Sequence, residues 1–127
     1  RVNGRIDAIY EPQPGSWEIV DFKSGRPSQQ PSARVQLEAY AVAVDEVRFA
    51  SIKPDHLLVT FAYLGDGLAE VSEEVDSSWL TAGRAHLVEL VRSIRGENWD
   101  PSPSIACHTC DFQRFCPPGR GWIAADI

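Results

Sequence analysis

An acid and an amine two residues apart, Asp21 and Lys23, are the side chains of this sequence best suited to chemistry. They end the apolar segment 17–23, which a Ser-Gly turn follows, so this segment is predicted to be a strand. Because side chains on a strand alternate between faces, Asp21 and Lys23 share one face and Phe22 points to the other. Such a carboxylate can bind a divalent cation, and the ammonium can hold a water or a phosphate. A solvated charge pair at a sheet edge has the same spacing, so the tripeptide alone does not decide.

A second carboxylate, Asp7, lies in the preceding strand-like segment, across a short turn from Asp21. In a hairpin the two can approach across the ladder, where facing Cβ atoms lie about 5 Å apart. Two carboxylates at that distance repel each other, and a bound cation would offset this repulsion. Two carboxylates and a backbone carbonyl suit Mg²⁺ or Mn²⁺. An ordinary exposed strand position is the alternative for Asp7.

Gln36 and Tyr40 lie four residues apart in a predicted helix and therefore share a face. Tyr40 can be explained as a core residue with its hydroxyl at the edge, whereas core packing does not explain Gln36. The functional interpretation has both lining a groove beside Asp21, where the amide and the hydroxyl contact a phosphate or the catalytic water.

The three cysteines, Cys107, Cys110 and Cys116, are clustered, and Cys-x2-Cys spacing brings two thiolates to one metal. An odd, clustered set is not a disulfide framework and indicates an intracellular metal or cluster site. Fe–S clusters normally take four cysteines, one more than the sequence supplies. Zinc with His108 as fourth ligand is awkward because His108 adjoins Cys107, and three free buried thiols are the remaining alternative.

The elements that must position these residues follow in the order β-β-α-β-β-α. The sequence predicts strands over 2–10, 17–23, 57–64 and 68–75, and helices over about 33–48 and 78–95. The inward stripes of the helices are expected to be Leu37, Tyr40, Ala41, Val44 and Val47, and Leu80, Leu87, Leu90, Val91 and Ile94. Asp76-Ser77-Ser78 is expected to cap the second helix, Gly96 to end it, and an extended linker to lead to the cysteines. The pattern is typical of an α/β fold with a sheet and flanking helices.

Composition restricts the possible classes. A length of 127 residues suggests one domain, and no apolar run approaches the ~18 residues of a membrane span. The net charge of −6 argues against a generic nucleic-acid coat but is compatible with a nuclease, because only the binding groove must be positive. The sequence begins without Met in a strand-like segment, so we expect it to be an excerpt of a longer, cytoplasmic protein.

Four short motifs occur in a fixed order: Gly4-Arg5-Ile6-Asp7, Asp21-Phe22-Lys23-Ser24-Gly25, Gln36-x3-Tyr40 and Cys107-x2-Cys110-x5-Cys116-Pro117. Together they resemble the RecB-type PD-(D/E)XK nucleases, in particular the nuclease domains of AddB- and UvrD/Rep-type helicase–nucleases. The resemblance implies a restriction-endonuclease-like mixed sheet of about four strands with two flanking helices. It also implies a nuclease core over residues 1–100 that lacks its first helix, and a cysteine-bearing tail over 101–127.

The resemblance assigns roles to individual residues. Asp7, Asp21 and the carbonyl of Phe22 would hold Mg²⁺ or Mn²⁺, and Lys23 would position or activate the attacking water. Gln36 and Tyr40 would form a further motif of the active site. Cys107, Cys110 and Cys116 would hold three corners of a [4Fe–4S] cluster. Arg5, Arg26 and Arg34 are candidate contacts to DNA phosphates, with solvated surface arginine as the alternative.

The family pattern has two parts that this sequence lacks: an N-terminal helix with a further metal-site residue, and a first cluster cysteine. We therefore expect this fragment to be weakly active or inactive alone. The predicted activity is hydrolysis of single-stranded DNA by an exonuclease joined to, or partnered with, a helicase in recombinational repair. A catalytically silent DNA-binding module of the same fold and a zinc-bound interaction module are the alternatives.

Overall fold

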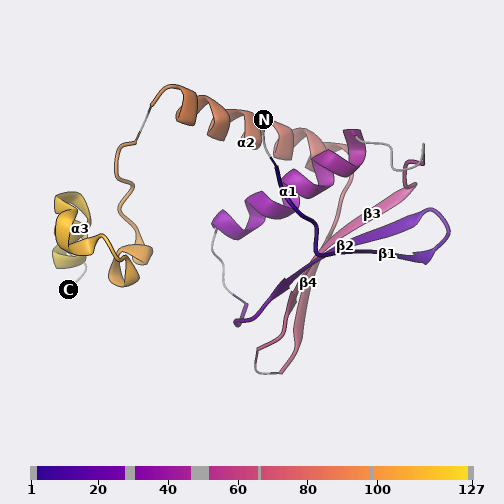
Figure 1. The fold of residues 1–127 in the computed structure, drawn as a ribbon, viewed down its shortest axis with the longest axis horizontal. Coiled ribbons are helices and arrows are strands. Elements are labelled where there is room, and N and C mark those ends of the chain that lie inside the picture. The colour runs from indigo at the N-terminus through magenta and orange to yellow at the C-terminus, as the bar shows by residue number, and fades with distance from the viewer. Residues whose placement is uncertain (1–2, 28–30, 47–51, 66, 98, 126–127) are drawn as a thin grey trace. The chain divides into compact units, whose positions relative to one another are not determined.

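The computed structural model describes residues 3–27, 31–46, 52–65, 67–97 and 99–125. They form two compact units, residues 1–90 and 91–127. The first contains a four-stranded sheet in the order β1-β2-β3-β4 (Figure 1). Its strands are β1 Ala8–Gln13, β2 Ser16–Lys23, β3 His56–Tyr63 and β4 Ala69–Glu74, and its helices are α1 Pro31–Glu46 and the first part of α2 Ser77–Arg95.

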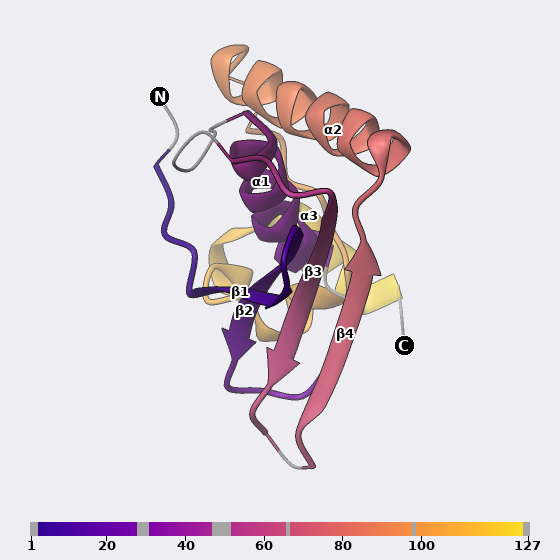
Figure 2. The same cartoon turned by 90° about the vertical axis from the view of Figure 1, so that its right-hand side faces the viewer.

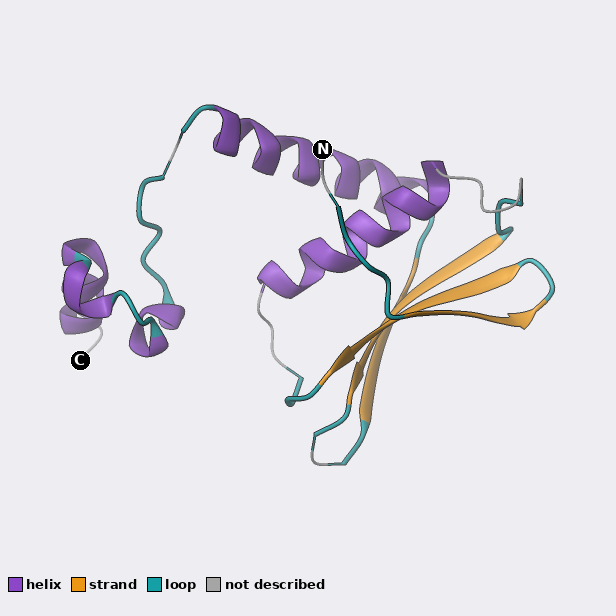
Figure 3. Ribbon diagram, in the orientation of Figure 1, coloured by secondary structure: helices purple, strands orange, loops and turns teal. Residues whose placement is uncertain are grey.

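The sheet is mixed. β1 and β4 are antiparallel to their neighbours β2 and β3, which are parallel to each other over their full lengths. A parallel pair needs a long connection, and α1 supplies it between β2 and β3 (Figure 3). The predicted element order, the hairpin and the restriction-endonuclease-like α/β class are therefore confirmed.

The first strand differs from the prediction over 2–10. It begins at Ala8 and continues to Gln13. Ala8 lies opposite Val20, and beyond this pair the Phe22 backbone N–H bonds to the Asp7 carboxylate, so the ladder stops before the end of β2. The strand continues through Pro12 because an edge strand does not need that backbone donor, and its register shifts between Tyr10 and Gln13. Val2 lies outside the described residues.

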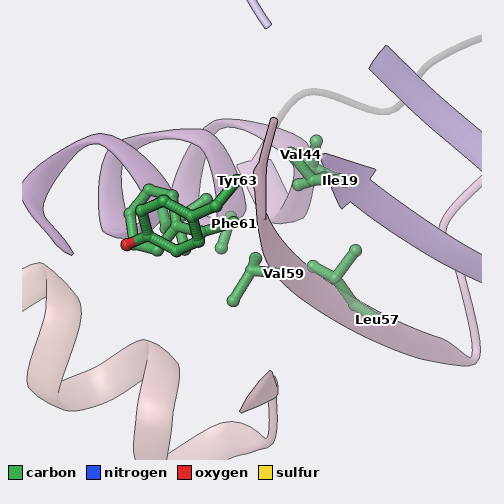
Figure 4. Packing of buried hydrophobic residues seen from close by; sticks show 8 residues of the cluster. Ile19, Val44, Leu57, Val59, Phe61 and Tyr63 are labelled. Carbon is green, nitrogen blue, oxygen red and sulfur yellow. The ribbon is translucent and has the colours of Figure 1, made fainter. Parts of the chain in front are cut away.

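The core lies between the sheet and α1, which the two views show on one side of the sheet (Figure 2). β2 contributes Ile19 and β3 contributes alternate residues, because every second side chain points toward the helix (Figure 4). The buried cluster consists of Ile19, Leu37, Ala41, Val44, Leu57, Val59, Phe61 and Tyr63. Of the predicted α1 stripe, Leu37, Ala41 and Val44 are buried and Tyr40 is half-buried, while Val47 lies outside the described residues.

Asp76 caps α2 as predicted: its carboxylate accepts hydrogen bonds from the Trp79 backbone N–H and the Ser78 hydroxyl, both at 2.7 Å. The predicted inward face of α2 is only partly right. Leu80 packs against the core, but Leu90, Val91 and Ile94 are exposed. The helix ends before Gly96, although the left-handed residue there is Glu97, at φ 51°.

The second unit holds the cysteines. Two short 3-10 helices, η1 Ile105–Thr109 and η2 Gln113–Phe115, precede α3 Pro117–Ala125, which the sequence patterns did not predict. No helix within the described ranges is long and apolar enough to cross a membrane.

Candidate active site

Asp21 and Lys23 lie at the end of β2, on the face of the sheet that α1 covers. The register places Asp21 beside Phe61 and Lys23 beside Tyr63, and both neighbours belong to the buried cluster. Asp21 is 3 % exposed, so it is not the solvated edge residue that the tripeptide alone also allowed. A buried carboxylate needs a compensating charge or hydrogen bonds, because burial penalises its charged form.

The compensating charge is the Lys23 ammonium. Its Nζ lies 2.6 Å from Asp21 Oδ2. The same nitrogen donates a hydrogen bond to Gln36 Oε1 at 2.5 Å and lies 5.4 Å from the centroid of the Phe61 ring. Asp21 Oδ2 itself accepts no hydrogen bond of acceptable angle from the described residues. The ion pair therefore holds this oxygen by charge rather than by directed bonding.

Asp7 reaches the same end of β2, as the sequence predicted for a hairpin. β1 begins at Ala8, opposite Val20, so Asp7 directly precedes the paired strand. Asp7 Oδ2 accepts a hydrogen bond from the backbone N–H of Phe22 at 3.1 Å. The two carboxylates thus flank one peptide segment of β2.

α1 brings the two residues of the third motif to this region, but in different surroundings. Gln36 contacts Lys23, as described above. Tyr40 packs against Gly4: a Cβ atom at Gly4 would lie 3.5 Å from the Tyr40 ring. The tyrosine therefore contacts the segment that leads into Asp7.

Arg34 is engaged away from these residues, toward β4. Its guanidinium lies 2.8 Å from Glu73 and 3.3 Å from Glu38, and it stacks over Trp79 with 5.5 Å between the Arg34 Cζ atom and the ring centroid. Two carboxylates compensate its charge, which weakens the case for a phosphate contact. Arg5 and Arg26 are exposed.

Sequence reasoning missed Glu38, a buried acid on α1. It accepts from Arg34 and contacts His86 Nδ1 at 2.6 Å, which connects α1 to α2. The available signal was its spacing of four residues from Arg34, the distance that joins side chains on one helical face.

A family model for the PD-(D/E)XK nuclease superfamily matches residues 1–117. The chain belongs to this superfamily. No curated protein and no solved structure matches it. Members of the superfamily are generally metal-dependent nucleases that act on DNA. This assignment agrees with the acids and the lysine found at the end of β2.

The site fits the divalent metal of PD-(D/E)XK nucleases in part. Asp7 and Asp21 supply two carboxylates, and Asp21 Oδ2 is a buried oxygen that lacks a hydrogen bond from the described residues. Hard cations such as Mg²⁺ prefer such oxygens and keep several waters. Among the described residues, no three His, Cys, Asp or Glu side chains are grouped to hold an ion. The superfamily's cation would therefore rest on two carboxylates and other oxygen donors.

The cysteines lie in the second unit, within the range of the superfamily match. A Cβ atom at the buried Gly119 would meet Cys116 Sγ at 3.3 Å and Cys107 Sγ at 3.5 Å, so these two sulfurs border the same glycine. Backbone N–H groups of Ser104 and Gly119 donate to Cys107 Sγ and Cys116 Sγ, each at 3.4 Å. Cys110 is exposed.

Proposed function

We propose that this chain carries the catalytic core of a Mg²⁺- or Mn²⁺-dependent deoxyribonuclease that hydrolyses phosphodiester bonds in single-stranded DNA from an end. The observation that carries the proposal is the buried Asp21, whose unbonded Oδ2 faces the Lys23 ammonium while Asp7 is fixed beside Phe22. When bound, the cation would supply Lewis acidity at the scissile phosphate and lower the pKa of a water.

The protein residues would do the rest by position and charge. Asp7, Asp21 and the carbonyl of Phe22 would hold the cation. Lys23 would orient the attacking water and stabilise the charge that develops on the phosphate. Gln36 and Tyr40 would keep Lys23 and the Asp7 segment in place, which their contacts with Lys23 and Gly4 support. Arg5, in the same segment as Asp7, is the arginine best situated to contact a phosphate.

The cysteine unit extends this proposal to the longer protein. Cys107, Cys110 and Cys116 would bind three irons of a [4Fe–4S] cluster, with a fourth cysteine from elsewhere, and the nuclease would act with a helicase in recombinational repair. The position of Cys107 and Cys116 beside Gly119 and the N–H donors on their sulfurs support a shared ligand for these two, although no three His, Cys, Asp or Glu side chains of the described residues are grouped to hold an ion. Iron and sulfide analysis of the purified protein tests this, because stoichiometric zinc without iron would favour the zinc-bound interaction module.

The nuclease proposal is tested by Mn²⁺-dependent digestion of end-labelled single-stranded DNA. We expect Asp21→Asn and Lys23→Ala each to lower the rate by roughly 100-fold or more, with folding and DNA binding retained. Glu70→Gln is the matched control, since it removes a carboxylate from the opposite face of the same sheet. Unchanged digestion in both variants would place the activity elsewhere. A protein that binds DNA but never cleaves it would support the silent DNA-binding module.

A further inference from the structure

The Lys23 ammonium has two oxygen neighbours of different character, an ion-pair partner and a hydrogen-bond acceptor. Asp21 Oδ2, at 2.6 Å, is a charged oxygen on the same strand, whereas Gln36 Oε1, at 2.5 Å, is a neutral oxygen on α1. We propose that Gln36 is a positioning residue that retains the Lys23 ammonium when a divalent cation takes Asp21. The Asp21–Lys23 ion pair is then the cation-free arrangement of the site. This inference rests on the proposed function, because it assigns the cation to Asp21.

The Lys23 ammonium and a divalent cation would compete for Asp21 because this carboxylate is buried. The carboxylate is 3 % exposed, so solvent screens its charge interactions poorly. A dication and an ammonium cannot both approach Oδ2 closely without repelling each other. The ammonium is the described partner of this oxygen, so a cation that binds Oδ2 replaces one charged partner by another.

The displaced ammonium then needs another acceptor. The Lys23 side chain is 28 % exposed, and a lysine without a partner in a half-buried site would turn toward water. Gln36 prevents this because its amide oxygen already accepts from Nζ. A neutral amide also suits this role: a carboxylate at residue 36 would hold the ammonium more strongly but would add a second competitor for the cation.

α1 holds Gln36 rigidly enough for this purpose. On one side of it, Leu37 is buried in the core. Two residues away on either side, Arg34 and Glu38 bond to each other, and Glu38 also contacts His86 of α2. The amide is thus presented from an anchored turn of the helix, and it reaches Lys23 without depending on DNA or on the cation.

The experiment measures Mn²⁺ affinity without DNA, by titration with electron paramagnetic resonance detection of the free ion. Four proteins are compared: the unmodified protein, Lys23→Met, Gln36→Leu and the double variant. We expect Lys23→Met to tighten Mn²⁺ binding about fivefold or more, because the competing ammonium is gone. Gln36→Leu should weaken binding by a similar factor, because the displaced ammonium then has no amide acceptor in the site and leaves Asp21 less readily.

The decisive result is the coupling between the two positions. In the Lys23→Met background, Gln36→Leu should leave the Mn²⁺ affinity unchanged, since no ammonium remains to be retained. An equal effect of Gln36→Leu in both backgrounds would overturn the inference and indicate a purely structural role or a direct contact to the substrate. Unchanged affinity in Lys23→Met would overturn it as well.

Asp21→Asn separates this inference from the proposed function. If Mn²⁺ binding does not depend on Asp21, the assignment of the metal site fails and the proposed function fails with it. If binding depends on Asp21 but shows no coupling between residues 23 and 36, only the role of Gln36 is wrong. Gln36→Asn adds a check that keeps the helix position polar and neutral: its shorter side chain should shift Mn²⁺ affinity only while Lys23 is present.

Discussion

At the scale of single residues, the main feature of the site is that the buried Asp21 carboxylate has few partners. Asp21 is enclosed among core side chains, and its described ion partner is an ammonium two residues along the same strand. A surface pair of this kind would contribute little to stability. Here the carboxylate is buried, so under the proposed function a cation that binds Asp21 would have to displace or share that partner.

Lys23→Arg tests the shape of that partner. Arginine keeps the positive charge but replaces a compact ammonium by a planar fork, which cannot occupy the same position between Asp21 and Gln36. We expect DNA cleavage to fall by roughly 100-fold or more, with thermal unfolding little changed, in steady-state assays with Mn²⁺. Lys53→Arg, at an ion pair with Asp45, serves as the control and should cleave normally. Full activity in Lys23→Arg would mean that charge alone suffices.

At the scale of elements, the sequence predicted the order of strands and helices because periodicity and turn residues are local signals. The cap of α2 was predictable for the same reason: Asp76 lies directly before the periodic segment and bonds to Trp79. The hairpin alone also predicted that Asp7 would lie near the end of β2, where it accepts a hydrogen bond from the Phe22 N–H. These features depend on residues that are near one another in the sequence.

Other features depend on partners that the sequence does not reveal. β1 starts at Ala8 because the Phe22 N–H bonds to the Asp7 side chain, and Gln36 bonds to Lys23 only because α1 crosses back over the sheet. The spacing of apolar residues in α2 predicted that Ile94 is buried, yet Ile94 is 58 % exposed. Such spacing identifies the apolar face of a helix but not whether another element packs against it. The position of Arg34 depends on Glu73, which comes from β4.

Gly83 of α2 offers a test of the helix–helix contact. A Cβ atom there would lie 3.5 Å from Glu38 Cγ and 3.6 Å from Trp79 Cζ3, which is ordinary van der Waals contact. We therefore expect Gly83→Ala to raise the free energy of unfolding by roughly 0.5–1 kcal/mol, because alanine restricts the unfolded chain and favours helix. Urea unfolding followed by circular dichroism measures it. Gly83→Val should instead destabilise, as its extra methyl groups meet the same neighbours; a loss with alanine would show that the contact has no spare room.

At the scale of the whole molecule, the net charge of −6 does not describe the site. Several acids are compensated by specific partners at the packing surfaces of helices, as Glu38 is by Arg34, and Asp45 by Lys53 and Arg84. The pH dependence of folding should therefore come from individual pairs rather than from the overall charge.

Asp45 makes the clearest contribution. The hydrogen bond from Lys53 lowers the pKa of this carboxyl below its usual 3.8, with burial opposing and Arg84 assisting. Because the pKa is depressed in the folded state, the stabilisation is present above pH 3.8 and is lost as the pH falls through the folded value. Asp45→Asn should thus be less stable at neutral pH, and the difference should shrink below about pH 3.8 in urea unfolding series. A difference independent of pH would contradict this; Asp111→Asn, an exposed acid, is the control.

The parallel pairing of β2 with β3 has a consequence for synthesis of the protein. The hairpin that carries Asp7, Asp21 and Lys23 can form as soon as residue 23 has left the ribosome, because its contacts are local. The buried side of that hairpin is completed only by α1 and by β3, which ends at Tyr63. A parallel strand cannot pair before its crossover exists. Asp7, Asp21 and Lys23 consequently reach their final surroundings only after a further 40 residues of translation, so the hairpin that carries the proposed site is made well before the core that buries it.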